Sequence, residues 1–141
     1  MPTCNHTIQI NASIQDVWQV LTDFEDYPNW NPLIGSIRGE VKENQWVMAY
    51  FTPLKLYVPV KIEAYQAHQT IVWKARLPHA YLMQGKHYYK LRPINEQLTE
   101  LEHGEIFSGL LSKLFPAFLL SKIQDAYQYH NQKLKVIAEN K

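Results

Sequence analysis

The hydrophobic repeat of the chain changes from a strand period to a helical period at Gly109, and this change most restricts the possible fold. After Gly109, large apolar residues recur every three or four positions, with Lys, Gln, Asp and Asn between them. This spacing predicts an amphipathic helix, which over residues 116–138 would be about 35 Å long. Its inward stripe consists of Phe115, Phe118, Leu119, Ile123, Tyr127, His130, Leu134 and Ile137.

Strand-forming segments dominate the chain between residues 34 and 107. They are rich in Val, Ile, Tyr, Phe and Trp, and breaks that contain Pro, Asn or His separate them. None of these breaks is long enough for a crossover helix, so the pattern predicts an antiparallel meander. The clearest segments are 45–52, 58–65, 70–77, 84–91 and 98–107.

The first thirty residues predict a strand followed by two short helices. Residues 7–11 alternate polar and apolar side chains, as a half-buried strand does. Ser13 is a good N-cap for a short amphipathic helix, and the dipeptides Tyr27-Pro28 and Asn31-Pro32 end helical structure. The aromatic residues in this segment should form the corner that joins helix to sheet.

Composition indicates an ordinary globular chain. Hydrophobic residues make up 46% of the 141 residues and charged residues 19%, and the formal net charge is +1. The 14 Lys and Arg residues are scattered, which disfavours nucleic-acid binding, and the net charge gives no reason to expect an anionic membrane. We expect a single domain spanning residues 1–141.

Targeting features favour a cytoplasmic protein. The first residues lack the charged start and apolar stretch of a secretory signal, and no run of about eighteen apolar residues predicts integral membrane insertion. Cys4 is the single cysteine, which excludes an internal disulfide and a multi-cysteine zinc site. We interpret Cys4 as a strand residue rather than a nucleophile.

Three segments resemble a known family when taken in order. They are residues 12–24 with the aromatic corner 27–32, residues 85–91, and residues 99–109. The chain resembles the START-like superfamily, with the helix-grip fold of the birch pollen allergen, and within it the bacterial polyketide cyclase/dehydrase-like (SRPBCC) group. The resemblance implies an α+β fold in which a curved antiparallel sheet of about seven strands wraps around a long C-terminal helix. It also implies a cavity between them, but lipid carriers, hormone receptors, cyclases and co-chaperone domains share this scaffold.

Strand alternation places polar residues on the inward face of the predicted strand 84–91. Lys86 and Lys90 should face water, which directs His87, Tyr89 and Leu91 inward. This face would carry one imidazole among apolar and aromatic neighbours.

The next predicted strand adds two more polar groups. Leu101 and Phe107 mark its inward face, so His103 and Glu105 share that face. If the hairpin turn centres near Asn95, Tyr89 pairs with Leu101 and His87 pairs with His103. Two imidazoles and a carboxylate would then lie on one otherwise apolar surface.

Three interpretations of His87, His103 and Glu105 follow. We favour a buried hydrogen-bonded network that also orients a polar group of the ligand, because unpaired burial of polar groups costs several kcal/mol. Acid–base catalysis by Glu105 with His87 or His103 is the second interpretation. A metal site is the third, since two His and one carboxylate form a facial triad, but the chain gives no other sign of it. We expect no metal and no cofactor, and no nucleophile lies beside these residues.

The remaining cavity wall follows from the same alternation, although any of its residues could instead fill a solid core. Val58, Ile123 and His130 complete the wall around the predicted ligand-binding residues. These are Val47, Ala49, Phe51, Val60, Ile62, Ile71, Trp73, Ala75, His87, Tyr89, Leu101, His103, Glu105, Phe118 and Tyr127.

The leading functional hypothesis is non-catalytic binding or transport of a small hydrophobic molecule, such as a lipid, an isoprenoid or a polyketide-like compound. The alternatives are a cyclase- or dehydratase-type enzyme, and a protein-interaction module in which the cavity is incidental. Two predicted loops, 54–57 and 110–114, are unusually apolar. They would form either a lid over the ligand or a homodimer contact.

Overall fold

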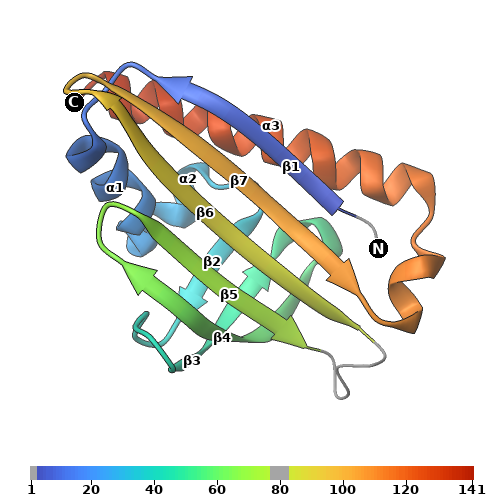
Figure 1. Cartoon of the computed structure of the whole chain (residues 1–141). Helices are drawn as coiled ribbons and strands as arrows, with labels where there is room; N and C mark the ends of the chain where they lie inside the picture. Colours follow the sequence, from blue (N-terminus) through green and yellow to red (C-terminus); the bar gives the residue numbers. More distant parts are fainter. Residues whose placement is uncertain (1–2, 77–82) are drawn as a thin grey trace.

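One curved antiparallel sheet forms the body of the molecule, with strand order β1-β7-β6-β5-β4-β3-β2 (Figure 1). The computed structural model describes residues 3–76 and 83–141, and this part of the chain contains seven strands. The antiparallel meander is confirmed, with β1 added beside β7. The strands are β1 (Thr3–Ile10), β2 (Ile34–Arg38), β3 (Trp46–Phe51), β4 (Leu56–Gln66), β5 (Thr70–Arg76), β6 (Gln84–Asn95) and β7 (Leu98–Ser108).

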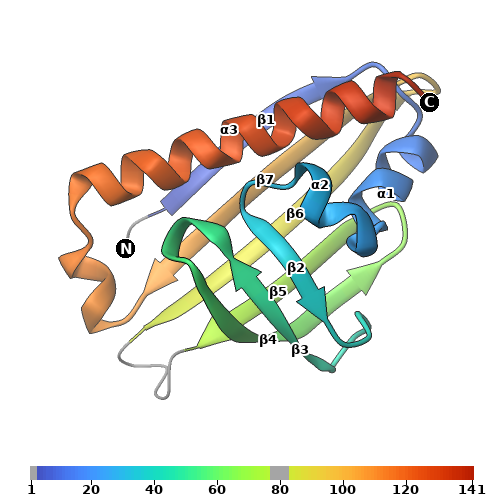
Figure 2. The same ribbon diagram turned by 180° about the vertical axis from the view of Figure 1, so that it is seen from behind.

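Two short helices join the edge strands β1 and β2, as expected. Helix α1 (Ile14–Thr22) begins after Ser13, whose hydroxyl oxygen accepts a hydrogen bond of 3.2 Å from the backbone N–H of Asp16. The 3-10 helix η1 (Phe24–Asp26) leads directly into α2 (Tyr27–Trp30). These helices cover one end of the concave face of the sheet (Figure 2).

The long helix α3 (Ala117–Glu139) crosses the concave face beside β1 (Figure 2). Its buried residues are Ile123, Tyr127, His130, Asn131, Leu134 and Ala138. Phe118 was expected inside, and this was wrong: its side chain is 75% exposed. Phe118 precedes Ile123 by five residues, or about 140° around the helix, so it faces away from the buried stripe.

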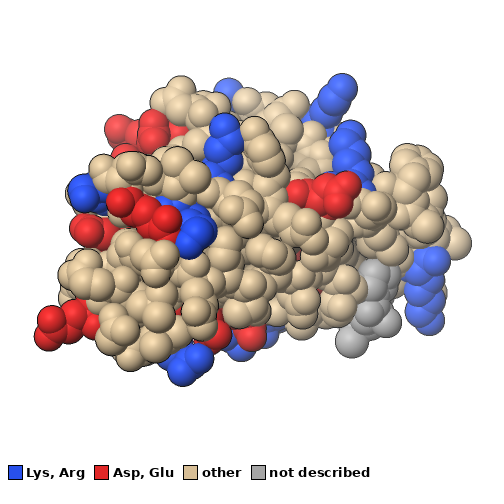
Figure 3. All heavy atoms as spheres, turned by 90° about the horizontal axis from the view of Figure 1, so that it is seen from above, with Lys and Arg blue, Asp and Glu red and all other residues tan. Residues whose placement is uncertain are grey.

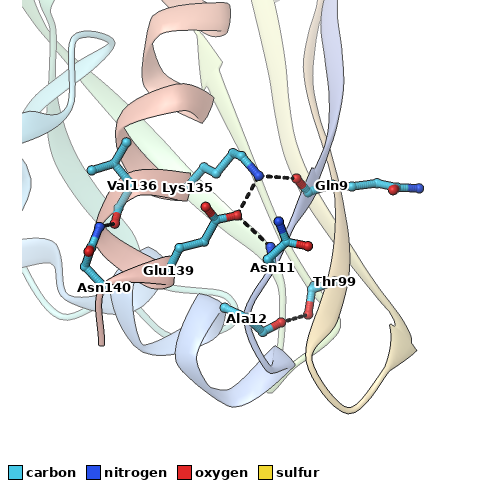
Figure 4. Close-up of polar contacts among 8 residues, drawn as sticks. All are labelled: Gln9, Asn11, Ala12, Thr99, Lys135, Val136, Glu139 and Asn140. Atoms are coloured by element: carbon cyan, nitrogen blue, oxygen red, sulfur yellow. Dashed lines mark hydrogen bonds and ion pairs between the residues drawn. The ribbon is translucent and has the colours of Figure 1, made fainter.

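Polar contacts fix the C-terminal end of α3 to the end of β1 (Figure 4). The ammonium group of Lys135 donates to the backbone oxygen of Gln9 at 3.0 Å and pairs with Glu139 one turn later. Glu139 also accepts a hydrogen bond of 2.7 Å from the backbone N–H of Asn11. The helix therefore has a fixed register along the sheet.

The β6–β7 hairpin differs from the prediction by two residues. Tyr89 pairs with His103 and His87 pairs with Glu105, because the turn lies at residues 96–97 rather than at Asn95. The side chain of Asn95 accepts a hydrogen bond from the backbone N–H of Gln97 and closes this turn. A slip of two residues changes the partners but preserves the face of every side chain.

The two apolar segments expected to be loops are partly regular. In the first, Leu56 and Tyr57 already belong to β4, after the 3-10 helix η2 (Thr52–Leu54). The second forms the 3-10 helix η3 (Leu110–Leu114), which leads into α3. Leu77, the last residue of one predicted strand, lies outside the described residues. Among the described helices, none is both long and apolar enough to span a membrane.

Candidate functional site

A cavity of about 190 Å³ lies between the concave face of the sheet, η3 and α3. Strands β3 to β7 supply most of its wall, which is largely aliphatic and aromatic. The lining residues are Leu33, Ile34, Ala49, Phe51, Leu54, Leu56, Val58, Val60, Trp73, Ala75, Met83, Gly85, His87, Glu105, Phe107, Leu111, Phe115 and Tyr127.

The cavity occupies the half of the sheet nearer η3, and the other half is solid core. Within the predicted wall, Ala49, Phe51, Val58, Val60, Trp73, Ala75, His87, Glu105 and Tyr127 line the cavity. Val47, Ile62, Ile71, Tyr89, Leu101 and His103 are buried but do not line it. On α1 and α2, the large aromatic side chains of Trp18, Tyr27 and Trp30 are also buried.

The polar end of the cavity is the carboxyl group of Glu105. Tyr127 on α3 donates a hydrogen bond of 3.0 Å to Oε1 of Glu105. No described residue donates to Oε2, which lies over the backbone of Gly85. A Cβ atom at position 85 would lie 2.5 Å from Oε2, so only glycine leaves room for this carboxyl position.

The environment of Glu105 favours its protonated form. Burial raises the pKa of Glu105 from 4.5 to about 7, and the hydrogen bond from Tyr127 opposes this shift only in part. Among the described residues that line the cavity, none is Lys or Arg. The carboxyl group therefore has no cationic partner and changes charge near neutral pH.

A hydrogen-bonded network around Asn131 lies beside Glu105. It includes the aromatic side chains of His6, His87, Tyr89, His103 and His130. The amide oxygen of Asn131 accepts hydrogen bonds of 2.9 Å from Nδ1 of both His103 and His130. Its amide nitrogen lies 3.0 Å from Nδ1 and 3.4 Å from the backbone oxygen of His6. A backbone oxygen only accepts, so this contact fixes the orientation of the amide.

The orientation of Asn131 determines the tautomers of the other imidazoles. His103 and His130 carry their protons on Nδ1, so Nε2 of each accepts: His130 from Tyr89 at 2.9 Å and His103 from His87 at 2.7 Å. His87 therefore carries its proton on Nε2, and its Nδ1 is a lone-pair acceptor. In the described part of the chain this buried Nδ1 has no hydrogen-bond partner, so the unpaired atom is an acceptor and not an N–H donor.

The three buried imidazoles are neutral at neutral pH. Burial lowers the pKa of His130 to about 3, and the hydrogen bond to Asn131 opposes this shift. Burial, with the neighbouring His130 as a second cause, also lowers the pKa of His87 and His103 well below 6.5. Stability from these neutral groups is present above pH 6.5 and is lost as the pH falls below that value.

The expected inward trio of His87, His103 and Glu105 is present, but its members have separate partners. The two imidazoles bond to each other through Nε2, whereas Glu105 bonds to Tyr127. No group of three metal-ligating side chains occurs within residues 3–76 and 83–141.

Sequence reasoning did not find Asn131. Its spacing, four residues after Tyr127 and three before Leu134, is the signal that could have placed it on the buried face of the helix. His130 was expected only as part of the wall, and Tyr127 was not expected to bond to Glu105.

Cys4 lies in β1, directly opposite Glu105 in β7, and is buried. Burial, with Glu105 as a second cause, raises the pKa of its thiol to about 11. The thiol is therefore protonated at neutral pH, which agrees with a structural role rather than a nucleophilic one.

Comparisons with known proteins agree with this architecture. A family model described as polyketide cyclase / dehydrase and lipid transport matches residues 1–139. A hypothetical protein, jhp0584, from Helicobacter pylori has a similar structure, with a TM-score of 0.81 and 11% identity over 97% of this chain and 88% of that chain. No curated protein matches the sequence.

Two further solved structures are similar to this chain. Ara h 8.0201 matches with a TM-score of 0.73 and 14% identity, over 99% of both chains. A START superfamily protein from Mycobacterium smegmatis matches with a TM-score of 0.67 and 15% identity, over 98% of this chain and 92% of that chain. At these identities the likeness shows a shared fold.

The contacts of Asn131 predict that removing its amide group strongly lowers the stability of the fold. Asn131→Leu leaves the N–H groups of His103 and His130 buried without acceptors, so we expect a loss of roughly 2–5 kcal/mol in the free energy of unfolding. The neighbouring Gln132 is exposed, and Gln132→Leu is the matched control, with an expected change within about 0.5 kcal/mol. Urea unfolding measures both, and equal effects would contradict the network.

The raised pKa of Glu105 predicts a pH-dependent difference between the wild type and Glu105→Gln. The folded protein holds this proton more tightly than the unfolded chain, so the stabilisation is full below pH 4.5 and disappears as the pH rises to about 7. Relative to the variant, the wild type should lose about 3 kcal/mol across this window. Histidine contributions cancel in the difference. Parallel stability–pH curves for the two proteins would show that burial does not shift this carboxyl group.

Proposed function

Because the chain belongs to the polyketide cyclase/dehydrase and lipid transport family, we propose that it binds a small hydrophobic molecule in the cavity beside α3. Membership of this family confirms the expected START-like resemblance, and the solved structures share the helix-grip fold. The observation that carries the proposal is an apolar cavity with the carboxyl group of Glu105 at its wall, beside His87 and Tyr127.

The size of the cavity favours a small ligand. Its volume of about 190 Å³ exceeds the roughly 150 Å³ of an engineered cavity that takes up benzene. It is below the range of about 300–1,000 Å³ that is typical for drug-sized ligands. A single-ring polyketide-like compound or a short isoprenoid fits this space better than a two-chain lipid does.

The chemistry of the wall favours a neutral ligand with one polar group. The protons of His87 and His103 are committed within the imidazole network, and Glu105 repels an anion when it is ionised. A ligand hydroxyl group would donate to Oε2 of ionised Glu105, and a carbonyl oxygen would accept from the protonated form. A ligand carboxylate would be buried without a cationic partner, which is costly.

Uptake of 2-naphthol, a neutral fluorescent molecule with one hydroxyl group, tests the proposal. Ala49 and Ala75 both line the cavity, so Ala49→Phe and Ala75→Phe fill space that the ligand needs. We expect each to weaken 2-naphthol binding by at least about tenfold, as one lost ring contact corresponds to more than about 1.4 kcal/mol. Met48→Phe, on the outer face of β3, is the matched control.

Circular dichroism checks that each of these variants is folded. Unchanged 2-naphthol affinity in both filled variants would contradict a ligand site at this position. Folded wild-type protein that takes up no 2-naphthol would instead favour the interaction-module alternative.

Catalysis by proton transfer is the second candidate function. The observation that favours it is the pKa of about 7 at Glu105, which suits a general base or acid near neutral pH. Tyr127, not His87 or His103, is its hydrogen-bonded partner. An enzyme of this kind would therefore use Glu105 with Tyr127 rather than with an imidazole.

Deuterium exchange at the α-carbon of phenylacetone, a single-ring ketone, separates the two functions. A binder should leave the exchange rate at its value in buffer, and this is the result we expect. An enzyme would accelerate exchange as the pH rises through about 7, and Glu105→Gln would abolish the acceleration while 2-naphthol binding remained. Glu102→Gln, on the exposed face of β7, is the matched control. If the wild type accelerates exchange, and Glu105→Gln loses this acceleration while Glu102→Gln keeps it, the protein is an enzyme and the binding proposal is wrong.

A further inference from the structure

Four large apolar side chains are exposed at the end of the molecule where η3 meets α3. We call them the apolar rim: Leu110, Leu111, Leu114 and Phe118. Their side chains are 62%, 40%, 74% and 75% exposed, respectively. Isolated exposed apolar residues are common, but four within nine positions of one segment are a concentration of the kind that marks an interaction site.

The apolar rim is continuous with the mouth of the cavity. Leu111 and Phe115 line the cavity, and they alternate along the chain with exposed Leu110 and Leu114. Leu54, Leu56 and Met83 are also partly or largely exposed lining residues, so the cavity opens on this side. A molecule that leaves the cavity therefore passes the apolar rim.

The charged residues of the segment that carries the apolar rim are all basic. Residues 106–124 contain two lysines, Lys113 and Lys122, and no Asp or Glu. Both lysines are exposed, and Lys122 lies four residues after Phe118, on the same face of α3. Figure 3 shows mostly uncharged surface at this end of the molecule, with basic and acidic side chains beside it. Asp125, which is exposed, directly follows this segment on α3. The formal net charge of +1 for the whole chain hides this local excess.

We propose that the apolar rim, with Lys113 and Lys122, docks on the surface of a lipid bilayer that contains anionic lipids. Exposed Leu and Phe side chains enter the boundary between headgroups and acyl chains, and lysines beside them pair with anionic headgroups. A second copy of the chain fits this surface less well, because two-fold pairing brings the same lysines together without an acidic partner from this segment.

Docking would place the mouth of the cavity against the bilayer, so a hydrophobic ligand would move between membrane and cavity without crossing water. This consequence rests on the proposed ligand binding, whereas docking itself does not. Membrane docking and ligand binding can therefore be tested separately. A variant that no longer binds vesicles should still take up 2-naphthol in solution, and a variant with a filled cavity should still bind vesicles.

Co-sedimentation with large unilamellar vesicles tests the docking. We expect the full chain to bind vesicles made of equal parts phosphatidylcholine and phosphatidylglycerol, and to bind pure phosphatidylcholine much more weakly. The double variant Leu114→Ser/Phe118→Ser should lower the partition coefficient by at least about tenfold. Lys113→Gln and Lys122→Gln should each lower it about fivefold, and added salt should weaken binding by the wild type.

Matched controls use the far end of α3. Val136 is 58% exposed, so Val136→Ser removes an exposed apolar side chain outside the apolar rim, and Lys133→Gln removes a partly exposed lysine there. Both should bind vesicles as the wild type does. All substitutions are at the surface, so thermal unfolding should show intact folds.

Three results would overturn the proposal. They are equal vesicle binding by the wild type and Leu114→Ser/Phe118→Ser, no binding to anionic vesicles, or a dimer in analytical ultracentrifugation that the same double variant abolishes in the absence of lipid. The last result would assign the apolar rim to a contact between two copies of the chain.

Discussion

The amide of Asn131 is the contact on which the interior of this protein depends. It joins α3 to the sheet by accepting from His103 on β7 and from His130 on its own helix. Because a neutral imidazole has one proton, these two bonds set the direction of every later bond in the chain of side chains. They direct His87 to donate to His103 and Tyr89 to donate to His130. A single amide thus satisfies several polar groups inside an apolar core.

Burial raises the pKa of Glu105, whose carboxyl group has no bond to the imidazole network. The neighbouring imidazole His87 has no free proton, and the described lining residues include no cation, so burial is opposed only by the hydrogen bond from Tyr127. The result is a carboxyl group that changes charge near neutral pH at the wall of an apolar cavity. Gly85 makes this possible, since any larger residue would displace Oε2. Of the trio, Glu105 is therefore the member whose charge changes near neutral pH.

The helical segments divide the interior into two halves with different roles. Helices α1 and α2 bring Trp18, Tyr27 and Trp30 into one half and fill it. The other half is covered by η3 with Phe115, and by Tyr127 of α3, and it retains a cavity with a mouth. The same short segment contributes lining residues and the exposed apolar rim. A packed half and a half that contains the cavity follow from this division.

The order of hydrophobic periods determined the antiparallel sheet, the long helix and the inward faces of His87, His103 and Glu105, because these depend on local alternation. Even a hairpin slip of two residues left those faces unchanged. The sequence did not determine which inward residues line a cavity, since that depends on what α1 and α2 fill. It also did not identify Asn131, whose partner His103 is 28 residues away. Nor did it show that the side chain of Phe118 faces solvent. Such contacts exist only once helix and sheet are packed, so only the tertiary structure decided them.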